Sequence, residues 1–230
     1  MTAWVPTGEF TIGLRPQPTR RITTSRTELI HVGVAFAVLA IDFALLRSSF
    51  TFRGALTPPD PSLVVALLPF GAAAALTGFI AHEMAHKVSA QRFGFWAEFR
   101  LSPSGLLLSL FTALVGFLFA APGATVVGGM GDVDEWGKTS LAGPSANLVQ
   151  GGAFALGAGL AASAHLPSAW IGTLLLLAYF NGWFGAFNLL PFGPLDGRKV
   201  YRWSRGVWGL TISIAIAFTV LTFFLSLASP

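Results

Sequence analysis

Residues 62–86 of the chain, SLVVALLPFGAAAALTGFIAHEMAH, decide its fold. The first 20 of these residues carry no charge, and about 20 apolar residues are enough to cross a bilayer as a helix. Two imidazoles and a carboxylate follow at once, on His82, Glu83 and His86. Because an ionisable side chain at membrane depth is costly, three together predict a functional site near the end of a membrane-spanning helix.

The composition indicates an integral membrane protein. Of the 230 residues, 53% are hydrophobic and only 10% are charged, whereas about 25% are charged in soluble domains. The chain has no cysteine, which excludes disulfides, thiolate zinc ligands and a cysteine nucleophile. Its 14 Lys and Arg residues are spread over loops beside apolar stretches, a pattern typical of a protein in a lipid bilayer and not of nucleic-acid binding.

We predict an all-α polytopic membrane protein with five to six transmembrane helices, a re-entrant segment and a small membrane-associated β element. Residues 1–28 form a polar N-terminal tail in this prediction, and residues 29–230 form a single membrane-embedded domain with its core at 63–200. Five stretches have the length and composition of spans: Leu29–Leu46, Leu63–Ala85, Thr139–Ala164, Ser168–Leu190 and Val207–Ala228. The short polar break HLPS at His165–Ser168 predicts that the third and fourth stretches form an antiparallel helical hairpin.

The uncharged segment Leu101–Gly131 either spans the membrane or dips in and returns, because prolines and glycines interrupt it. A full span divides the 14 basic residues evenly between the two sides of the membrane. A re-entrant segment places 12 of the 14 on one side, as the positive-inside rule favours. We therefore predict a re-entrant segment, a cytoplasmic N-terminus in the cell membrane and a site near the cytoplasmic side.

Two strands are predicted around this segment. Phe93–Leu101 alternates apolar and polar residues with a period of two, and Gly123–Gly129 is the second candidate. Extended backbone at membrane depth needs protein or water to satisfy its amides. We therefore expect both strands to border a cavity.

The motif predicts a metal site. His82 and His86 lie on one face of a helix, so one ion can bind both imidazoles, while Glu83 is turned toward a bound water. This H-E-x-x-H arrangement is typical of zinc hydrolases with one catalytic ion. In the alternative interpretation, the histidines reach lipid headgroups, and Glu83 forms a charge pair with Lys87 at the interface.

A catalytic zinc ion needs a third protein ligand. Asp196 is favoured, because the prolines and glycines of NLLPFGPLDG break the preceding helix and turn the chain back toward the histidines. The alternative for Asp196 is an ordinary turn residue. The other candidates are His31, Asp42, Glu98 and His165. Of these, we expect His31 at the interface and Asp42 in polar packing or near the outer surface.

The order of these motifs resembles the site-2 protease family of intramembrane zinc metalloproteases. The matching elements are HEMAH, Asn188–Pro191, Asp196-Gly197 and, on an intervening helix, AGPSANL at Ala142–Leu148. The resemblance implies that His82, His86 and Asp196 hold zinc and that Glu83 activates water. It also implies cleavage of peptide bonds within or next to transmembrane helices of membrane-protein substrates. Arg198 departs from the family pattern, in which many members have a further glycine.

Asn188 is the second predicted catalytic residue, because a preorganised amide donor stabilises the negative charge that develops on an attacked carbonyl. Asn147 is the rival for this role, and its alternative is polar packing between helices. Gly143 and Ser145 are interpreted as close-packing residues. Phe93–Leu101 or Ala124–Gly128 is predicted to pair with an unwound substrate.

Two other functions are compatible with these residues. A zinc transporter also places His and Asp in helices, but it needs ionisable residues along a path through the bilayer, whereas here they lie at one depth. A relative that binds membrane helices without cutting them would not need Glu83. A serine protease is not supported, because the chain has no G-x-S-x-G.

Overall fold

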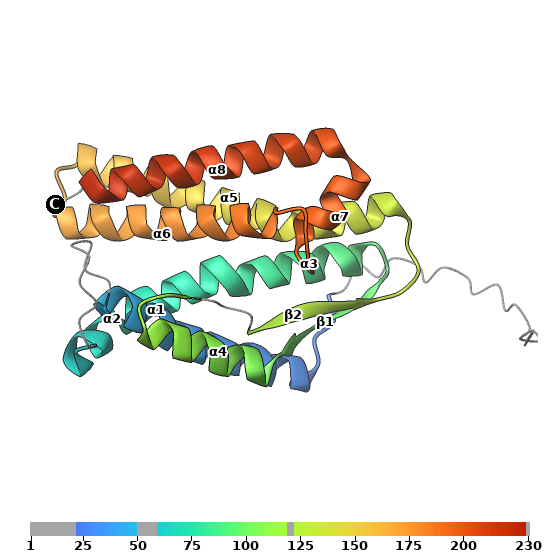
Figure 1. Ribbon diagram of the computed structural model, residues 1–230, viewed down its shortest axis with the longest axis horizontal. Helices are drawn as coiled ribbons and strands as arrows, with labels where there is room; N and C mark the ends of the chain where they lie inside the picture. Colours follow the sequence, from blue (N-terminus) through green and yellow to red (C-terminus); the bar gives the residue numbers. More distant parts are fainter. Residues whose placement is uncertain (1–21, 50–58, 119–121, 229–230) are drawn as a thin grey trace, which may run out of the picture.

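The computed structural model describes residues 22–49, 59–118 and 122–228. Figure 1 shows long helices running in roughly one direction, with α1 to α4 and a small sheet on one side and α5 to α8 on the other. The prediction of a mainly helical membrane protein with a small β element is confirmed.

The motif lies on one long helix. Its parts are α2 (Pro61–Ala74), a π-helical turn, η1 (Ala75–Ile80), and α3 (Ala81–Arg92). They form a continuous span of 32 residues. Asp60 caps the start by accepting a hydrogen bond from the amide of Ser62 at 2.9 Å. The predicted end was wrong, because the helix continues for six residues beyond His86.

The two predicted strands pair with each other. β1 (Trp96–Leu101) and β2 (Gly123–Gly128) are antiparallel, with Leu101 opposite Gly123. The intervening segment therefore returns to the point where it left the sheet. Its helix α4 (Pro103–Leu114) has 12 residues, fewer than the approximately 20 that cross a bilayer. The predicted alternation in β1 is confirmed, because Ala97 and Phe99 are buried while Trp96 is exposed.

The second half of the molecule is a helical hairpin followed by a short and a long helix. α5 (Val133–Ser163) begins with a capping box between Asp132 and Glu135. It turns at His165, which has a positive φ of 55°, into α6 (Ser168–Asn188). The predicted hairpin is thus confirmed. The chain ends with α7 (Asp196–Trp203) and α8 (Arg205–Ala228).

Four helices of the described residues are long and apolar enough to cross a membrane: Arg26–Ser48 of α1 (Arg26–Ser49), Pro61–Arg92, Ser168–Asn188 and Arg205–Ala228. They match four of the five predicted spans. α5, with 31 residues, covers the remaining predicted span, Thr139–Ala164, but is less apolar, because it contains many glycine and polar residues. The total number of spans and the re-entrant segment stay predictions.

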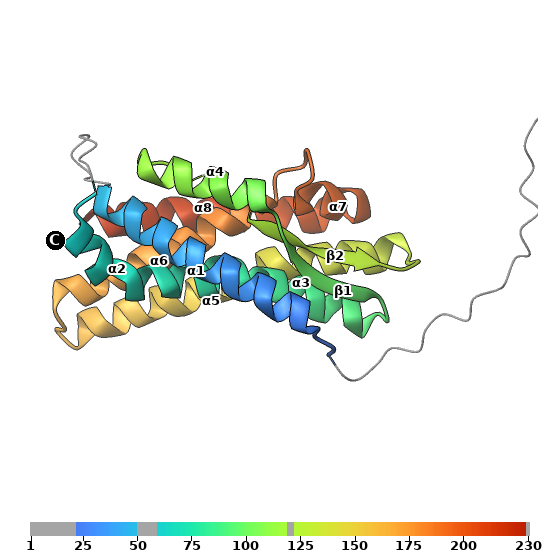
Figure 2. The ribbon, with the colours of Figure 1, turned by 90° about the horizontal axis from the view of Figure 1, so that it is seen from below.

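The fold gathers polar elements at one end of the molecule. Figures 1 and 2 show the sheet, α7, the start of α5 and the C-terminal part of α3 at the same end. α3 packs against α5, and α5 packs against α7. The apolar core lies beside them, where Phe79 contacts Phe99 and Phe43 contacts Phe184, both edge to face.

Candidate metal centre

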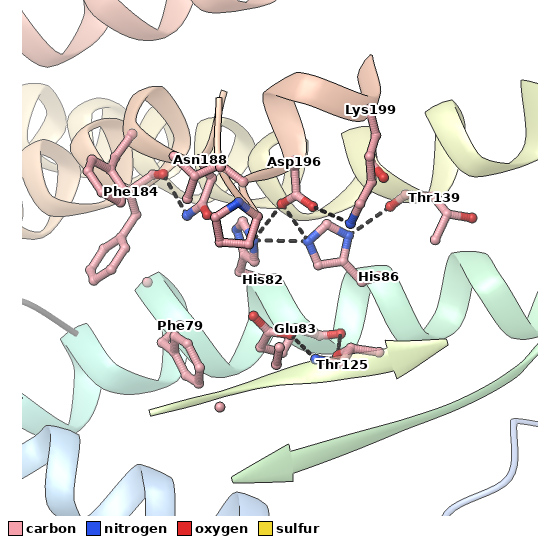
Figure 3. A pocket seen from close by; sticks show the side chains of 18 of the residues that line it. Phe79, His82, Glu83, His86, Thr125, Thr139, Phe184, Asn188, Asp196 and Lys199 are labelled. Carbon is pink, nitrogen blue, oxygen red and sulfur yellow. Dashed lines mark hydrogen bonds and ion pairs between the residues drawn. The ribbon is translucent and has the colours of Figure 1, made fainter. Parts of the chain in front are cut away.

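Three potential ligands from two elements converge. His82 and His86 lie one turn apart on α3, and Asp196 is the first residue of α7. Asp196 Oδ2 lies 2.9 Å from His86 Nε2 and 3.4 Å from His82 Nε2, and the two Nε2 atoms are 3.0 Å apart. Figure 3 shows both imidazoles turned toward the Asp196 carboxylate. The structure therefore brings together the three predicted ligands.

The other nitrogen of each imidazole faces a hydrogen-bond acceptor. His82 Nδ1 lies 2.6 Å from Asn147 Oδ1, and His86 Nδ1 lies 2.7 Å from the carbonyl oxygen of Thr139. Both Nδ1 atoms must therefore carry the proton and donate it. Each Nε2 then directs its lone pair toward Asp196.

This arrangement fits a zinc ion. Two imidazole lone pairs and a carboxylate oxygen meet at a largely buried point, and positive charge is needed to hold three acceptors together. Tetrahedral zinc with bonds of about 2.0–2.1 Å separates its ligand atoms by roughly 3.3 Å, close to the three distances found here. Two histidines and one carboxylate are also a known catalytic zinc set.

Tight turns deliver Asp196 to the histidines. Between α6 and α7, Gly193 adopts a positive φ of 62°. A Cβ on Gly197 would lie 1.9 Å from the carbonyl oxygen of Leu189, so only glycine allows α7 to start against the end of α6. α7 therefore begins at the point where its first carboxylate meets the two Nε2 atoms.

Gly143 has no side chain that would collide with the ligand atoms of the two histidines. A Cβ at this position would lie 2.4 Å from His86 Nε2 and 2.6 Å from His82 Nε2. The backbone of α5 thus forms one wall of the metal centre. Close packing describes Gly143 correctly, but its neighbours are the ligand atoms themselves.

Glu83 points to a different partner. Its Oε2 accepts a hydrogen bond from the backbone amide of Thr125 on β2 at 2.6 Å, and Thr125 Oγ1 donates to the carbonyl oxygen of Glu83 at 2.9 Å. In Figure 3, the Glu83 side chain lies toward β2, while the two imidazoles lie toward Asp196. The alternative charge pair with Lys87 was wrong, because Lys87 Nζ binds Glu28 Oε2 at 2.5 Å.

Asn188 lines the same cavity as the histidines and Glu83. The cavity has a volume of about 510 Å³. Asn188 Nδ2 donates to the carbonyl oxygen of Phe184 at 3.0 Å, which fixes the side chain at the end of α6. The apolar lining is rich in aromatic residues, among them Phe79, Trp136, Trp183, Phe184 and Phe187.

The remaining candidates lie outside the metal centre. Asp42 is buried on α1 and accepts a hydrogen bond from Ser109 of α4 at 2.7 Å, which agrees with the polar packing predicted for it. Glu98 pairs with Arg100 on β1. His165 lies in the turn after α5, and His31 lies on α1.

Several functional contacts were missed by sequence reasoning. The π-helical turn, Asn181 and the role of Thr125 had no recognisable signal, because each depends on a partner far along the chain. The sequence leaves packing or direct catalysis open for Asn147, and in the structure its side chain contacts His82 Nδ1. An amide in a glycine-rich helix that must face the motif was the available signal.

The chain is similar to two proteins named as zinc metalloproteases. It is 32% identical over 190 residues to "Putative zinc metalloprotease MJ0611" of Methanocaldococcus jannaschii, covering 81% of this chain and 89% of that protein. It is 31% identical over 179 residues to "Putative zinc metalloprotease Rip3" of Mycobacterium tuberculosis. That match covers 76% of this chain but 42% of Rip3, so the chain spans less than half of that relative. No family model and no solved structure match the chain.

Proposed function

The chain belongs to the site-2 protease family of zinc metalloproteases, and from this premise we propose that it is an intramembrane protease. It hydrolyses peptide bonds within or next to the transmembrane helices of membrane-protein substrates. The observation that carries the proposal is the convergence of His82 Nε2, His86 Nε2 and Asp196 Oδ2 in a cavity that Glu83 also lines. One zinc ion is the proposed cofactor.

Glu83 is the proposed general base. His82, His86 and Asp196 would hold the zinc ion, which would lower the pKa of a water to about 7 and polarise a carbonyl group. Glu83 accepts the proton of the attacking water and returns a proton to the leaving amine. The hydrogen bond from Thr125 N–H to Oε2 supports this role, because it fixes the carboxylate within the cavity.

Asn188 is the proposed donor to the substrate carbonyl. One of its amide hydrogens is directed to the carbonyl oxygen of Phe184, which leaves the second hydrogen for a ligand in the cavity. A preorganised donor to the developing oxyanion is worth about 3 kcal/mol. Asn147 does not take this role, because its Nδ2 is directed to Gly78 O and Asn181 Oδ1.

The substrate is proposed to add to β2 and not to β1. The outer edge of β1 is covered, because Phe99 N–H donates to Glu28 and the carbonyl oxygen of Ala97 accepts from Gln91. Hydrogen-bonded and non-bonded pairs alternate along an antiparallel ladder. Phe99 and its partner Thr125 form a non-bonded pair, so Val127, two residues on, also directs its N–H and C=O away from β1. This outer edge borders the cavity, and extended peptides bind such edges.

The proposed topology places the metal centre near the cytoplasmic face of the cell membrane, with residues 29–230 as one membrane domain. Its support is the charge distribution. The exposed basic residues of α7 are Arg198, Lys199 and Arg202, and they lie at the same end as the sheet and the C-terminal part of α3 (Figure 1). In this topology α4 and its flanking strands form the re-entrant segment, which enters and leaves on the cytoplasmic side.

Cleavage of a single-span substrate by the reconstituted protein tests the proposal. We expect Glu83→Gln to reduce the cleavage rate about 10²–10⁴-fold, while bound zinc stays at the wild-type level. Glu98→Gln is the matched control, because it makes the same acid-to-amide change on β1, outside the metal centre, and it should retain activity. Equal cleavage by wild type and Glu83→Gln would refute the proposal. Zinc flux into the vesicles without cleavage would identify a transporter instead.

A further inference from the structure

A buried amide cluster joins the motif helix to α5 and α6. Asn147 and Asn181 are both fully buried. Asn147 Nδ2 donates to the carbonyl oxygen of Gly78 at 2.8 Å and to Asn181 Oδ1 at 3.2 Å. Asn181 Nδ2 in turn donates to Thr77 Oγ1 at 3.2 Å. The cluster therefore ends on the π-helical turn, whose last residue, Ile80, lies two residues before His82.

The amides donate hydrogen bonds to backbone carbonyl groups of the π-helical turn. A π turn shifts the backbone hydrogen-bond register, and carbonyl groups without a partner are costly at membrane depth. Two side chains of α5 donate hydrogen bonds to carbonyl groups of this turn. Asn147 binds Gly78 O, and Gln150 Nε2 donates to Thr77 O at 3.1 Å.

These bonds leave Asn147 only one orientation. Because Nδ2 is directed to Gly78 and Asn181, Oδ1 must face His82 Nδ1, which lies 2.6 Å away. An acceptor at this position requires that His82 Nδ1 carry the proton, so Nε2 keeps its lone pair for a metal ion. If the amide were reversed, NH₂ would face His82 Nδ1 and favour the wrong tautomer.

We propose that Asn147 is a positioning residue for the metal ligand His82 and that the π-helical turn sets its orientation. The inference rests on the metal centre of the proposed function. Asn147 does not touch substrate or zinc, and it acts through the tautomer and ring orientation of His82. The sequence interpretations of Asn147, packing or direct catalysis, are replaced by this role.

Zinc affinity of three variants, measured by competition with a chelator, tests the inference. Asn147→Leu removes the acceptor and should weaken zinc binding about 10–100-fold. Asn147→Asp keeps an acceptor for His82 but loses the donor to Gly78 and Asn181, so it should bind zinc more tightly than Asn147→Leu. Gln150→Leu is the matched control, because it also removes an amide from the π-helical turn but does not contact His82, and its zinc affinity should be unchanged.

Absorption of bound Co²⁺ provides a second measurement that does not depend on Asn147→Leu folding. Asn147→Asp places a charged acceptor behind His82, so its ligand-field bands should shift from those of wild type. Gln150→Leu should leave the bands unchanged. Equal zinc loss in Asn147→Leu and Gln150→Leu, or unshifted Co²⁺ bands in Asn147→Asp, would overturn the inference.

Failure of the inference about Asn147 can be distinguished from failure of the proposed protease function. Wild-type cleavage of a membrane substrate with no dependence of zinc affinity on Asn147 would leave the protease proposal intact and overturn the inference. Zinc binding that depends on Asn147, in a protein that cleaves no membrane substrate, would support the inference and overturn the protease proposal. Thermal unfolding of each variant without metal separates local effects at His82 from general loss of stability.

Discussion

Two buried polar clusters lie on different faces of α3, and they differ in the charges that they contain. On the sheet side, Lys87 Nζ binds Glu28 Oε2 at 2.5 Å and Thr24 Oγ1 at 2.8 Å, and Glu28 Oε1 accepts from Phe99 N–H at 3.0 Å. On the α5 side, His82, His86 and Asp196 direct three acceptor atoms to one point. The first cluster contains a buried cation, whereas in the second the nearest described cation is the half-exposed Lys199, whose Nζ lies 3.8 Å from Asp196 Oδ1 and does not reach the point between the imidazoles.

This difference separates a structural cluster from a functional one. Glu28 and Lys87 are 1% and 2% exposed, and each compensates the buried charge of the other. They tie the start of α1 to α3 and cover the outer edge of β1. The three acceptors of the metal centre do not compensate one another, and Lys199 faces only the other carboxylate oxygen, Oδ1, so a metal ion fits the point where Oδ2 and the two Nε2 atoms meet.

The largest effect is expected when the metal centre loses its carboxylate. Asp196→Asn removes the charged ligand and should weaken zinc binding by on the order of 10³-fold. This loss corresponds to one ligand's share of the total free energy of zinc binding. Removing one of three mutually repelling acceptors should leave the metal-free protein as stable as wild type. Chelator competition and thermal unfolding of the metal-free protein measure both effects. Strong destabilisation of the metal-free protein would show that Asp196 has a structural role like that of Glu28.

The opposite result is expected for the structural cluster. Glu28→Gln leaves the buried ammonium of Lys87 without a counter-charge and should lower the free energy of unfolding by about 3 kcal/mol. Zinc affinity should stay at the wild-type level. Denaturant unfolding in detergent measures the change, and the double variant Glu28→Gln/Lys87→Met should recover most of it. Lack of recovery would show that the pair is not the source of the stability.

A smaller effect is expected when the wall of the metal centre is thickened. Gly143→Ala adds a methyl group less than 3 Å from both Nε2 atoms, and displaced ligands of this kind should reduce cleavage about 10²-fold. Gly152→Ala is the control on the same helix, where no atom lies within 4 Å of the added carbon. It should raise stability by up to about 1 kcal/mol and preserve cleavage. Similar initial cleavage rates for the two variants would contradict the close approach of α5.

The smallest effect concerns the open edge of the sheet. Val127→Pro removes an N–H that points away from β1 and should slow cleavage of a membrane substrate about tenfold, the value of one hydrogen bond. Val127→Ala keeps the N–H and serves as the control. Kinetics with equal zinc loading measure the difference. If the proline variant cleaves at the rate of the alanine variant, the substrate does not pair with β2.

The local elements of this fold could be predicted because each has a signal within a short window. Apolar length gave the spans, alternation gave β1, and Pro167 with its neighbours gave the α5–α6 hairpin. The spacing of His82 and His86 also requires only one helix. Asp196 could be anticipated because helix breakers surround it, although its proximity to the histidines depends on tertiary packing.

The contacts that orient the site could not be predicted from the sequence. The π-helical turn Ala75–Ile80 has no distinctive composition, and it is compensated by Asn147 and Gln150 from another helix. Lys87 lies one turn after Glu83, and local spacing favoured that pair. Burial against α1 favoured Glu28 instead. In each case a partner about 60 or more residues away decided the contact.

X-ray absorption at the zinc edge of the purified, zinc-loaded protein tests the central claim most directly, namely that two imidazoles and one carboxylate hold the ion. The spectrum should contain scattering from two imidazole rings and from oxygen at about 2.0–2.2 Å, and it should be retained in Glu83→Gln. In Asp196→Asn the zinc content should fall. A spectrum without imidazole scattering, or an Asp196→Asn protein with unchanged spectrum and zinc content, would contradict the account.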